Sequence, residues 1–153
     1  MRYNLGMEKY QLFRVVAAAV IHDGGGKFLL AQRHAKDDNQ PSTWAIPAGH
    51  LEVDEPLNQA IPDALEENLK REVKEEIGID ISIDKYLDSH FWIVEDEYRK
   101  LTVVFLCRVK SGEPKALDET QSVKWLRLDE ISDLNLAPEI LRLTTKANKV
   151  LNN

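Results

Sequence analysis

The sequence predicts an α+β fold, arranged as an α/β/α sandwich with an acidic helix in the middle of the chain and a second helix near its C-terminal end. Three observations lead to this fold class. β-rich apolar runs stand on both sides of one helical pattern, glutamates crowd that pattern, and strands and helices do not alternate as in a doubly wound fold. With 153 residues, the chain suits a single domain over residues 1–153.

The first third of the chain is predicted to form short strands. The apolar runs 13–23 and 27–34 flank a glycine turn at residues 24–26, which predicts a β-hairpin. The polar run 35–43 is typical of a loop. The run 44–51 then predicts a short strand that ends in a turn of proline and glycine.

A helical pattern follows, from residue 63 to residue 77. Asp63 is expected to be the N-cap with Glu66 as its capping-box partner, and Gly78 is expected to end the helix. One face of the helix should pack on a sheet, because apolar residues recur there at every fourth position: Leu65, Leu69, Val73 and Ile77.

The second half of the chain is again rich in β-branched and aromatic residues. Residues 79–94 and 100–109 predict two strands joined by a turn, and residues 122–128 predict a third strand. Helical spacing returns from residue 138 to residue 151, which predicts the terminal helix. Phe91 is expected to lie in the core.

Composition argues against several classes of function. The net charge of −6 disfavours binding to a nucleic-acid backbone, which calls for a basic face. The single cysteine, Cys107, stands in an apolar run and is expected to be a buried small side chain. No apolar run approaches the length of a membrane span, and no signal segment is recognised. A cytoplasmic protein that binds neither nucleic acid nor membrane is expected.

The acidic helix carries three glutamates on one face, Glu72, Glu75 and Glu76. Like charges at the edge of a packed face repel one another, and the cost grows with burial. Lys70 and Lys74 lie towards solvent and cannot neutralise all three. A hard divalent cation such as Mg²⁺ could, because it prefers carboxylate oxygens. From spacing alone, a solvated face with salt bridges is an equal alternative.

The residues around these glutamates resemble the Nudix box. That pattern is Gly, five residues, Glu, seven residues, then Arg-Glu-apolar-x-Glu-Glu-x-Gly-apolar. The stretch REVKEEIGI at 71–79 matches its second half at every specified position, and Gly49 matches its first glycine. The approach WAIPAGH at 44–50 is also similar, with Ala48 where glycine is commoner. The resemblance implies the Nudix α/β/α sandwich with a mixed central β-sheet.

The first acid of the box is displaced. Glu55 has the right spacing from Gly49, whereas Asp63 has the right spacing from Arg71, because the chain carries eight extra residues between them. The resemblance gives this acid the task of bracing the arginine and the loop, and either residue could perform it. An enlarged loop of this kind costs little stability.

The resemblance also implies a metal-dependent hydrolase. Carried over residue by residue, the metal ligands would be Glu72, Glu75 and Glu76 with the backbone carbonyl of Gly49, and the ion would be Mg²⁺ or Mn²⁺. Arg71 would orient the carboxylates by charge-assisted contacts. The reaction class is the attack of water on one phosphorus of a nucleoside diphosphate that is linked to another group.

Other site residues stay open at this level. The general base is expected to be Glu75 on the helix or Glu119 in a later loop, where a solvated acid is equally expected. His50 could contact a phosphate or serve the turn, and Trp92 could stack on a base or fill the core. The acids at 95–97 are expected to be solvated in a hairpin turn.

The box does not fix the substrate. The chain lacks the downstream proline of many ADP-ribose hydrolases and the signatures of coenzyme A and NADH hydrolases. By elimination, we expect a small-molecule nucleotide, namely a nucleoside triphosphate (oxidised ones included), cleaved to monophosphate and pyrophosphate. ADP-ribose or a nucleotide sugar is the alternative on the same scaffold, and a Nudix domain that binds nucleotides without turnover is a second alternative. A homodimer is compatible with the resemblance, but no feature requires it.

Overall fold

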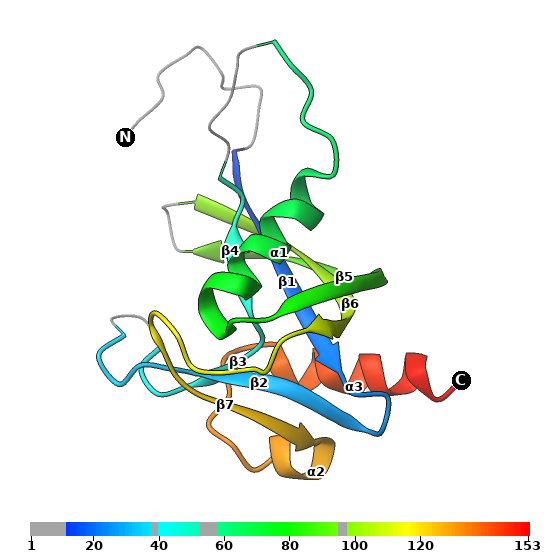
Figure 1. Ribbon diagram of the computed structural model, residues 1–153. Coiled ribbons are helices and arrows are strands. Elements are labelled where there is room, and N and C mark those ends of the chain that lie inside the picture. Colours follow the sequence, from blue (N-terminus) through cyan, green and yellow to red (C-terminus); the bar gives the residue numbers. More distant parts are fainter. Residues whose placement is uncertain (1–11, 38–39, 53–57, 95–97) are drawn as a thin grey trace.

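The computed structural model describes residues 12–37, 40–52, 58–94 and 98–153. Within these ranges the chain forms a seven-stranded sheet with helices on both of its faces (Figure 1). In chain order the elements are β1 (Phe13–His22), β2 (Lys27–Arg33), β3 (Trp44–Ala45), β4 (Ala48–His50), α1 (Ala64–Ile77), β5 (Asp80–Val94), β6 (Tyr98–Ser111), β7 (Thr120–Arg127), α2 (Leu128–Ile131) and α3 (Ile140–Leu151).

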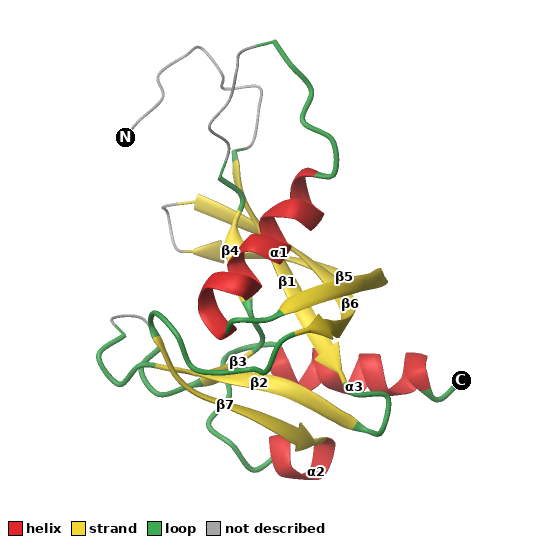
Figure 2. Cartoon of the chain, viewed as in Figure 1, coloured by secondary structure: helices red, strands yellow, loops and turns green. Residues whose placement is uncertain are grey.

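The sheet is mixed, as the resemblance implies. Its order is β3-β2-β1-β6-β5, with β4 added to β1 and β7 added to β2. β1 runs parallel to β6, and the other pairs are antiparallel. β1 and β2 meet only where His22 lies opposite Phe28, so β2, β3 and β7 diverge from the rest of the sheet, as Figure 2 shows. β4 takes the place beside β1 that β2 leaves free.

Alternate residues of β1 face the two helical layers, one on each side of the sheet. Ala17, Ala19 and Ile21 pack in the core under α1, whereas Ala18 and Val20 pack in the core under α3. The run of alanines keeps this central strand thin, which lets both helices approach it. The helices complete these cores with residues that are fully or almost fully buried: Leu69, Val73 and Ile77 from α1, and Ile140, Leu143 and Ala147 from α3.

The central helix is confirmed, but its predicted cap is wrong. Gly78 ends α1 in the left-handed conformation, with φ of 74°, and its N–H donates to the Lys74 carbonyl at 3.0 Å. Asp63 does occupy the N-cap position, yet its φ is 51° and its side chain caps no N–H group. A side-chain cap needs extended backbone at that residue, so the capping box with Glu66 does not form.

The strand predicted over 44–51 is two strands, β3 and β4. Pro47 stands between them and has no N–H to give to a ladder. Its carbonyl accepts a hydrogen bond from the Ala19 N–H at 2.9 Å. The chain therefore changes partner at this proline, from β2 to β1, and so carries Gly49 to the side of the sheet that α1 covers.

The prediction that Phe91 lies in the core is wrong, because its side chain is 61% exposed. β5 is an edge strand of the sheet, and Phe91 lies near the end of its hairpin with β6. Trp92 is also largely exposed, at 44%. The register between β5 and β6 shifts three times in the first part of the strand, between Asp80 and Ile81, Ile83 and Lys85, and Tyr86 and Asp88.

The expectation for Cys107 is confirmed. The residue is fully buried in β6, and burial raises the pKa of its thiol to about 12, so the side chain is an inert part of the core. In the part of the chain that the structure describes, no helix is both long and apolar enough to cross a membrane. The acids at 95–97 and Glu55 lie outside the described residues.

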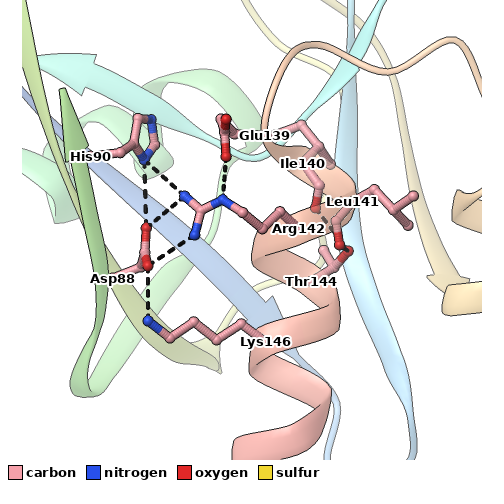
Figure 3. Close-up of polar contacts among 8 residues, drawn as sticks. All are labelled: Asp88, His90, Glu139, Ile140, Leu141, Arg142, Thr144 and Lys146. Atoms are coloured by element: carbon pink, nitrogen blue, oxygen red, sulfur yellow. Dashed lines mark hydrogen bonds and ion pairs between the residues drawn. The ribbon is translucent and has the colours of Figure 1, made fainter. Parts of the chain in front are cut away.

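An ionic cluster around the buried carboxylate of Asp88 ties α3 to β5 (Figure 3). The Asp88 carboxylate, 7% exposed, accepts hydrogen bonds from both terminal nitrogens of Arg142, at 3.1 and 2.9 Å, and from Lys146 Nζ at 2.8 Å. His90 Nδ1 lies 3.6 Å from the same carboxylate, and Glu139 pairs with Arg142. The bonds from Arg142 and Lys146 hold the pKa of Asp88 well below its usual range.

Because Asp88 has a lowered pKa in the folded state, it stabilises the fold above the pKa of an unfolded aspartate, about 4, and loses this contribution as the pH falls below it. We expect Asp88→Asn to lower the free energy of unfolding at pH 7 by about 2–3 kcal/mol, because hydrogen bonds to a charged group are lost. The loss should shrink on acidification. Urea unfolding at pH 3 and pH 7 measures both quantities.

The control is Asp129→Asn, which removes a carboxylate that pairs with Arg127 at an exposed position. It should leave stability unchanged at both pH values. An equal effect of the two substitutions would contradict the role given to burial at Asp88.

Candidate active site

The site begins where β4 passes beneath α1. A Cβ atom added to Gly49 would lie 2.1 Å from Glu72 Cγ and 2.3 Å from Glu72 Cδ, which is far inside van der Waals contact. The Glu72 side chain thus occupies the space that any other residue at position 49 would fill. Glycine is required here for close approach, and it brings a carboxylate against the backbone of the strand.

The hydrogen-bond ladder between β4 and β1 determines which backbone groups of β4 point towards β1 and which point to the open side of β4. The Leu51 N–H donates to the Val15 carbonyl and the Ala19 N–H donates to the Pro47 carbonyl, so Gly49 belongs to the hydrogen-bonded pairs that alternate along this ladder. Its carbonyl is therefore turned towards β1. The polar backbone groups of the residues on either side, Ala48 and His50, point outward instead.

Glu76 is mostly buried beside this strand edge. Burial raises the pKa of its carboxyl to about 8, and the nearby charge of Glu72 adds to the rise. The Ala48 N–H donates to the carboxylate, and the positive charge of Arg33 also favours the ionised form, but neither offsets the burial.

Arg71 contacts several polar side chains close to Glu72 and Glu76. Its Nη2 lies 2.8 Å from Asn68 Oδ1 and 3.1 Å from Glu72 Oε1, and its Nη1 lies 3.3 Å from both carboxylate oxygens of Glu75. Glu52 adds an ion pair at 3.8 Å. Glu75 is exposed and turned to the arginine, while Glu72 and Glu76 turn to the strand.

These residues fit a divalent cation through the chemistry of their donors. Glu72 and Glu76 supply hard oxygens at the edge of a backbone cradle that a Cβ atom would fill, and burial together with the charge of Glu72 raises the pKa of Glu76. Among the described residues, however, no three acidic, histidine or cysteine side chains already converge as a metal cage.

The later loop brings a different acid to the helix than the sequence indicates. The Leu117 N–H donates to the Glu76 carbonyl at 3.1 Å, so the loop packs on the end of α1. Asp118 and Glu119 are both exposed; the charge of Asp118 makes a minor contribution to the raised pKa of Glu76, and the Glu119 backbone carbonyl accepts a hydrogen bond from the His34 N–H. The sequence analysis named Glu119 as one of two open candidates and did not consider Asp118, one position before it.

His50 and Trp92 lie on the other face of the sheet. β1 residues of even number face α3, and His50 pairs with Val16. Arg14, Lys100 and Trp92 form the adjacent row across β1, β6 and β5. Partial burial lowers the pKa of His50, and the charges of Arg14 and Lys100 lower it further. The structure therefore places His50 and Trp92 near the cations Arg14 and Lys100, and not beside the carboxylates of Glu72 and Glu76.

Asn68 is the second residue that the sequence analysis missed. It lies four residues before Glu72, so it extends the arc of the glutamates by one helical turn. Asp63, by contrast, lies eight residues before Arg71, which is about 12 Å along a helix axis, and it is exposed.

We expect Gly49→Ala to weaken binding of Mn²⁺ by about 10- to 100-fold, because the new methyl group displaces Glu72 from the strand. Titration of the protein with Mn²⁺, followed by electron paramagnetic resonance, measures the affinity. The matched control is Gly25→Ala, where the nearest atom to the added Cβ is Asp23 Oδ1 at 3.5 Å, an ordinary contact. Unchanged affinity in Gly49→Ala would contradict the assignment.

The raised pKa of Glu76 has a consequence for the metal-free protein. Between pH 4.5 and about 8 the folded state holds a proton that the unfolded state has lost, so the stability of the metal-free fold falls as the pH rises through this range. Glu76→Gln cannot ionise and should remove that fall. In EDTA at pH 8 we expect the substitution to raise Tm, by about 2–4 °C for each kcal/mol recovered.

Thermal unfolding in EDTA at pH 5 and pH 8 checks this expectation. A parallel pH dependence in the two proteins would show that Glu76 ionises in the folded state as easily as in the unfolded one. Glu66→Gln, in the first turn of the same helix, serves as the control for the loss of a charge.

Comparison with known proteins agrees with this geometry. A family model described as the NUDIX domain matches residues 12–147. A search of curated proteins finds no match. Among solved structures, a MutT NUDIX hydrolase from Burkholderia pseudomallei is 24% identical with a TM-score of 0.72, and the match covers 89% of this chain and 98% of that one.

Two further structures are similar. The E. coli ORF135 protein is 30% identical with a TM-score of 0.65, over 95% of this chain and 94% of that one. The NUDIX domain of Shewanella oneidensis NrtR, solved with ADP ribose, is 22% identical with a TM-score of 0.69, over 97% and 94%. Because the family model spans most of its length, the chain belongs to the NUDIX family and is a pyrophosphohydrolase of nucleoside diphosphate derivatives.

Proposed function

We propose that this enzyme hydrolyses a nucleoside triphosphate, oxidised ones included, to a monophosphate and pyrophosphate, and that the reaction depends on Mg²⁺ or Mn²⁺. The observation that carries the proposal is the pairing of Glu72 and Glu76 against the backbone of β4. The carboxylates of Glu72 and Glu76 lie between α1 and β4, and the pKa of Glu76 is raised to about 8. This arrangement favours a cation that bridges the carboxylates and a polyphosphate.

Glu72, Glu76 and a backbone carbonyl of β4 would hold the metal, with Glu75 as a further ligand. Gly49 is the carbonyl that the box pattern indicates, and Ala48 is the one whose backbone faces outward. When bound, the ion would neutralise charge on the phosphate oxygens and lower the pKa of a coordinated water.

Glu75 is our candidate for the general base. It is exposed, so a water molecule can reach it, and Arg71 holds its carboxylate through two contacts at 3.3 Å. In the step we propose, one proton of the water passes to Glu75, the water oxygen forms the new bond to phosphorus, and the bond to the bridging oxygen breaks. Glu119 stays a candidate from the sequence, and Asp118 joins it because its charge acts on Glu76.

The nucleoside is proposed to lie over the row that ends in Trp92. An indole that is 44% exposed offers a stacking surface for a base. Lys100 is its neighbour in the row, and His50 stands one row away at the end of β4, next to the glycine of the box. We propose that His50 contacts a phosphate that extends from one side of β4 to the other.

ADP-ribose or a nucleotide sugar is the second candidate on this scaffold. It is favoured by the similarity of the fold to the NrtR domain, which was solved with ADP ribose. A binding domain without turnover is disfavoured, because all three box glutamates are present.

The experiment is product analysis by mass spectrometry. The protein is incubated with Mg²⁺ and nucleoside triphosphates, oxidised nucleotides, ADP-ribose or nucleotide sugars. We expect pyrophosphate and a monophosphate from a triphosphate, and no reaction in EDTA. Two monophosphates from ADP-ribose or a sugar nucleotide would instead select the second candidate.

Glu76→Gln should lower the turnover number by orders of magnitude with the fold intact, since it removes a metal ligand. Full activity of this variant, or full activity in EDTA, would rule out the proposed metal site.

A further inference from the structure

Asn68 is a buried polar residue in the middle of α1, and its side-chain amide is fully engaged. It is 7% exposed, among apolar neighbours of the same helix that pack on the sheet. Its oxygen accepts a hydrogen bond from Arg71 Nη2 at 2.8 Å and a longer one from the Glu52 N–H at 3.5 Å. Its nitrogen donates to the His50 carbonyl at 3.1 Å and, more weakly, to the Gly49 carbonyl at 3.5 Å.

These contacts need both a donor and an acceptor in one short side chain. A carboxylate of the same size could accept from Arg71 but could not donate to a carbonyl, and a leucine could do neither. Asn68 therefore links three parts of the site at once: the guanidinium of Arg71, the outward carbonyl of His50, and the start of the enlarged loop at Glu52.

We propose that Asn68 is a positioning residue, which performs the bracing that the box pattern assigns to its first acid. The inference rests on the proposed function, because it concerns how Arg71 and the end of β4 are held for that reaction. Asp63 lies too far along the helix to reach Arg71, at about 12 Å. Asn68 is one turn away from Arg71 and bonded to it.

The proposal also accounts for the tolerance of the extra residues. All the groups that Asn68 holds on the strand side, from Gly49 to Glu52, come before the enlarged loop. The geometry at the carboxylates is therefore fixed by a contact that does not depend on the length of that loop. Arg71 in turn contacts Glu72 and Glu75. A substitution of Asn68 that displaces the guanidinium would therefore also displace these two carboxylates.

A double-mutant cycle with Mn²⁺ as the probe tests this chain of contacts. We expect Asn68→Leu and Arg71→Ala each to weaken Mn²⁺ binding by about tenfold, the scale of a lost contact to a metal ligand. The double variant should bind no more weakly than the weaker single variant, because both substitutions break one path. Full additivity of the two losses, or wild-type affinity in Asn68→Leu, would overturn the proposal.

Asn68→Asp keeps the acceptor for Arg71 but loses the donor to the His50 carbonyl, and it serves as the test if Asn68→Leu does not fold. We expect it also to weaken Mn²⁺ binding by about tenfold, because a carboxylate cannot donate a hydrogen bond to that carbonyl. Wild-type affinity in Asn68→Asp would overturn the proposal. In kinetics with the nucleotide found by product analysis, Asn68→Leu should lower kcat with little change in KM.

Thr144→Ala is the matched control, because it removes a buried hydrogen bond from α3, at a distance from the site. It should lower Tm and leave Mn²⁺ affinity and kcat unchanged. Because Mn²⁺ binding is measured without substrate, the two proposals fail separately. No turnover of any nucleotide together with non-additive Mn²⁺ affinities would reject the proposed function and keep the role of Asn68.

Discussion

The site depends on how closely α1 can approach the backbone of β4. That distance is set by one missing side chain, at Gly49, above which Glu72 lies. Because the helix is so close, Glu76 accepts a hydrogen bond from the Ala48 N–H, and Asn68 donates one to the His50 carbonyl. The polar face of the helix therefore meets a strand edge and not water, and its carboxylates acquire neighbours that an exposed helix would never give them.

The same closeness creates an electrostatic conflict. Glu76 is partly buried near the like charge of Glu72, and its raised pKa reflects the resulting cost of ionisation. The fold tolerates this cost because its stability comes from elsewhere. Two apolar cores cover the two faces of β1, and the Asp88 cluster fastens α3 to the edge of the sheet. A locally unfavourable arrangement is typical of a functional site in an otherwise well-packed scaffold.

The sequence predicted those features that follow from periodicity and from glycine. The helix and its end at Gly78 could be predicted because an apolar stripe and a left-handed terminus have local signatures. The failed cap at Asp63 and the split of the strand at Pro47 depend on backbone angles and on pairing partners that no local pattern specifies. Phe91 was misplaced because its exposure follows from the position of β5 at the edge of the sheet.

At the site, the sequence indicated the residue types but not their partners. The three glutamates and Arg71 could be found as a motif, since their spacing along one helix is local. Asn68 could not, because its role comes from contacts with β4, a segment far away in the sequence. A buried asparagine has no distinctive spacing, and its role becomes visible only when its four neighbours are known.

The edge position of β5 gives the two halves of this long strand different behaviour towards other chains. The first half is interrupted by register shifts as far as Asp88, and such bulges twist an edge away from a flat, pairable form. From Asp88 to Val94 the pairing with β6 is regular, and the exposed side chains of Phe91, Trp92 and Ile93 follow one another there. Along β5, the regular and apolar stretch from Asp88 to Val94 is therefore where a strand of another chain would pair most readily.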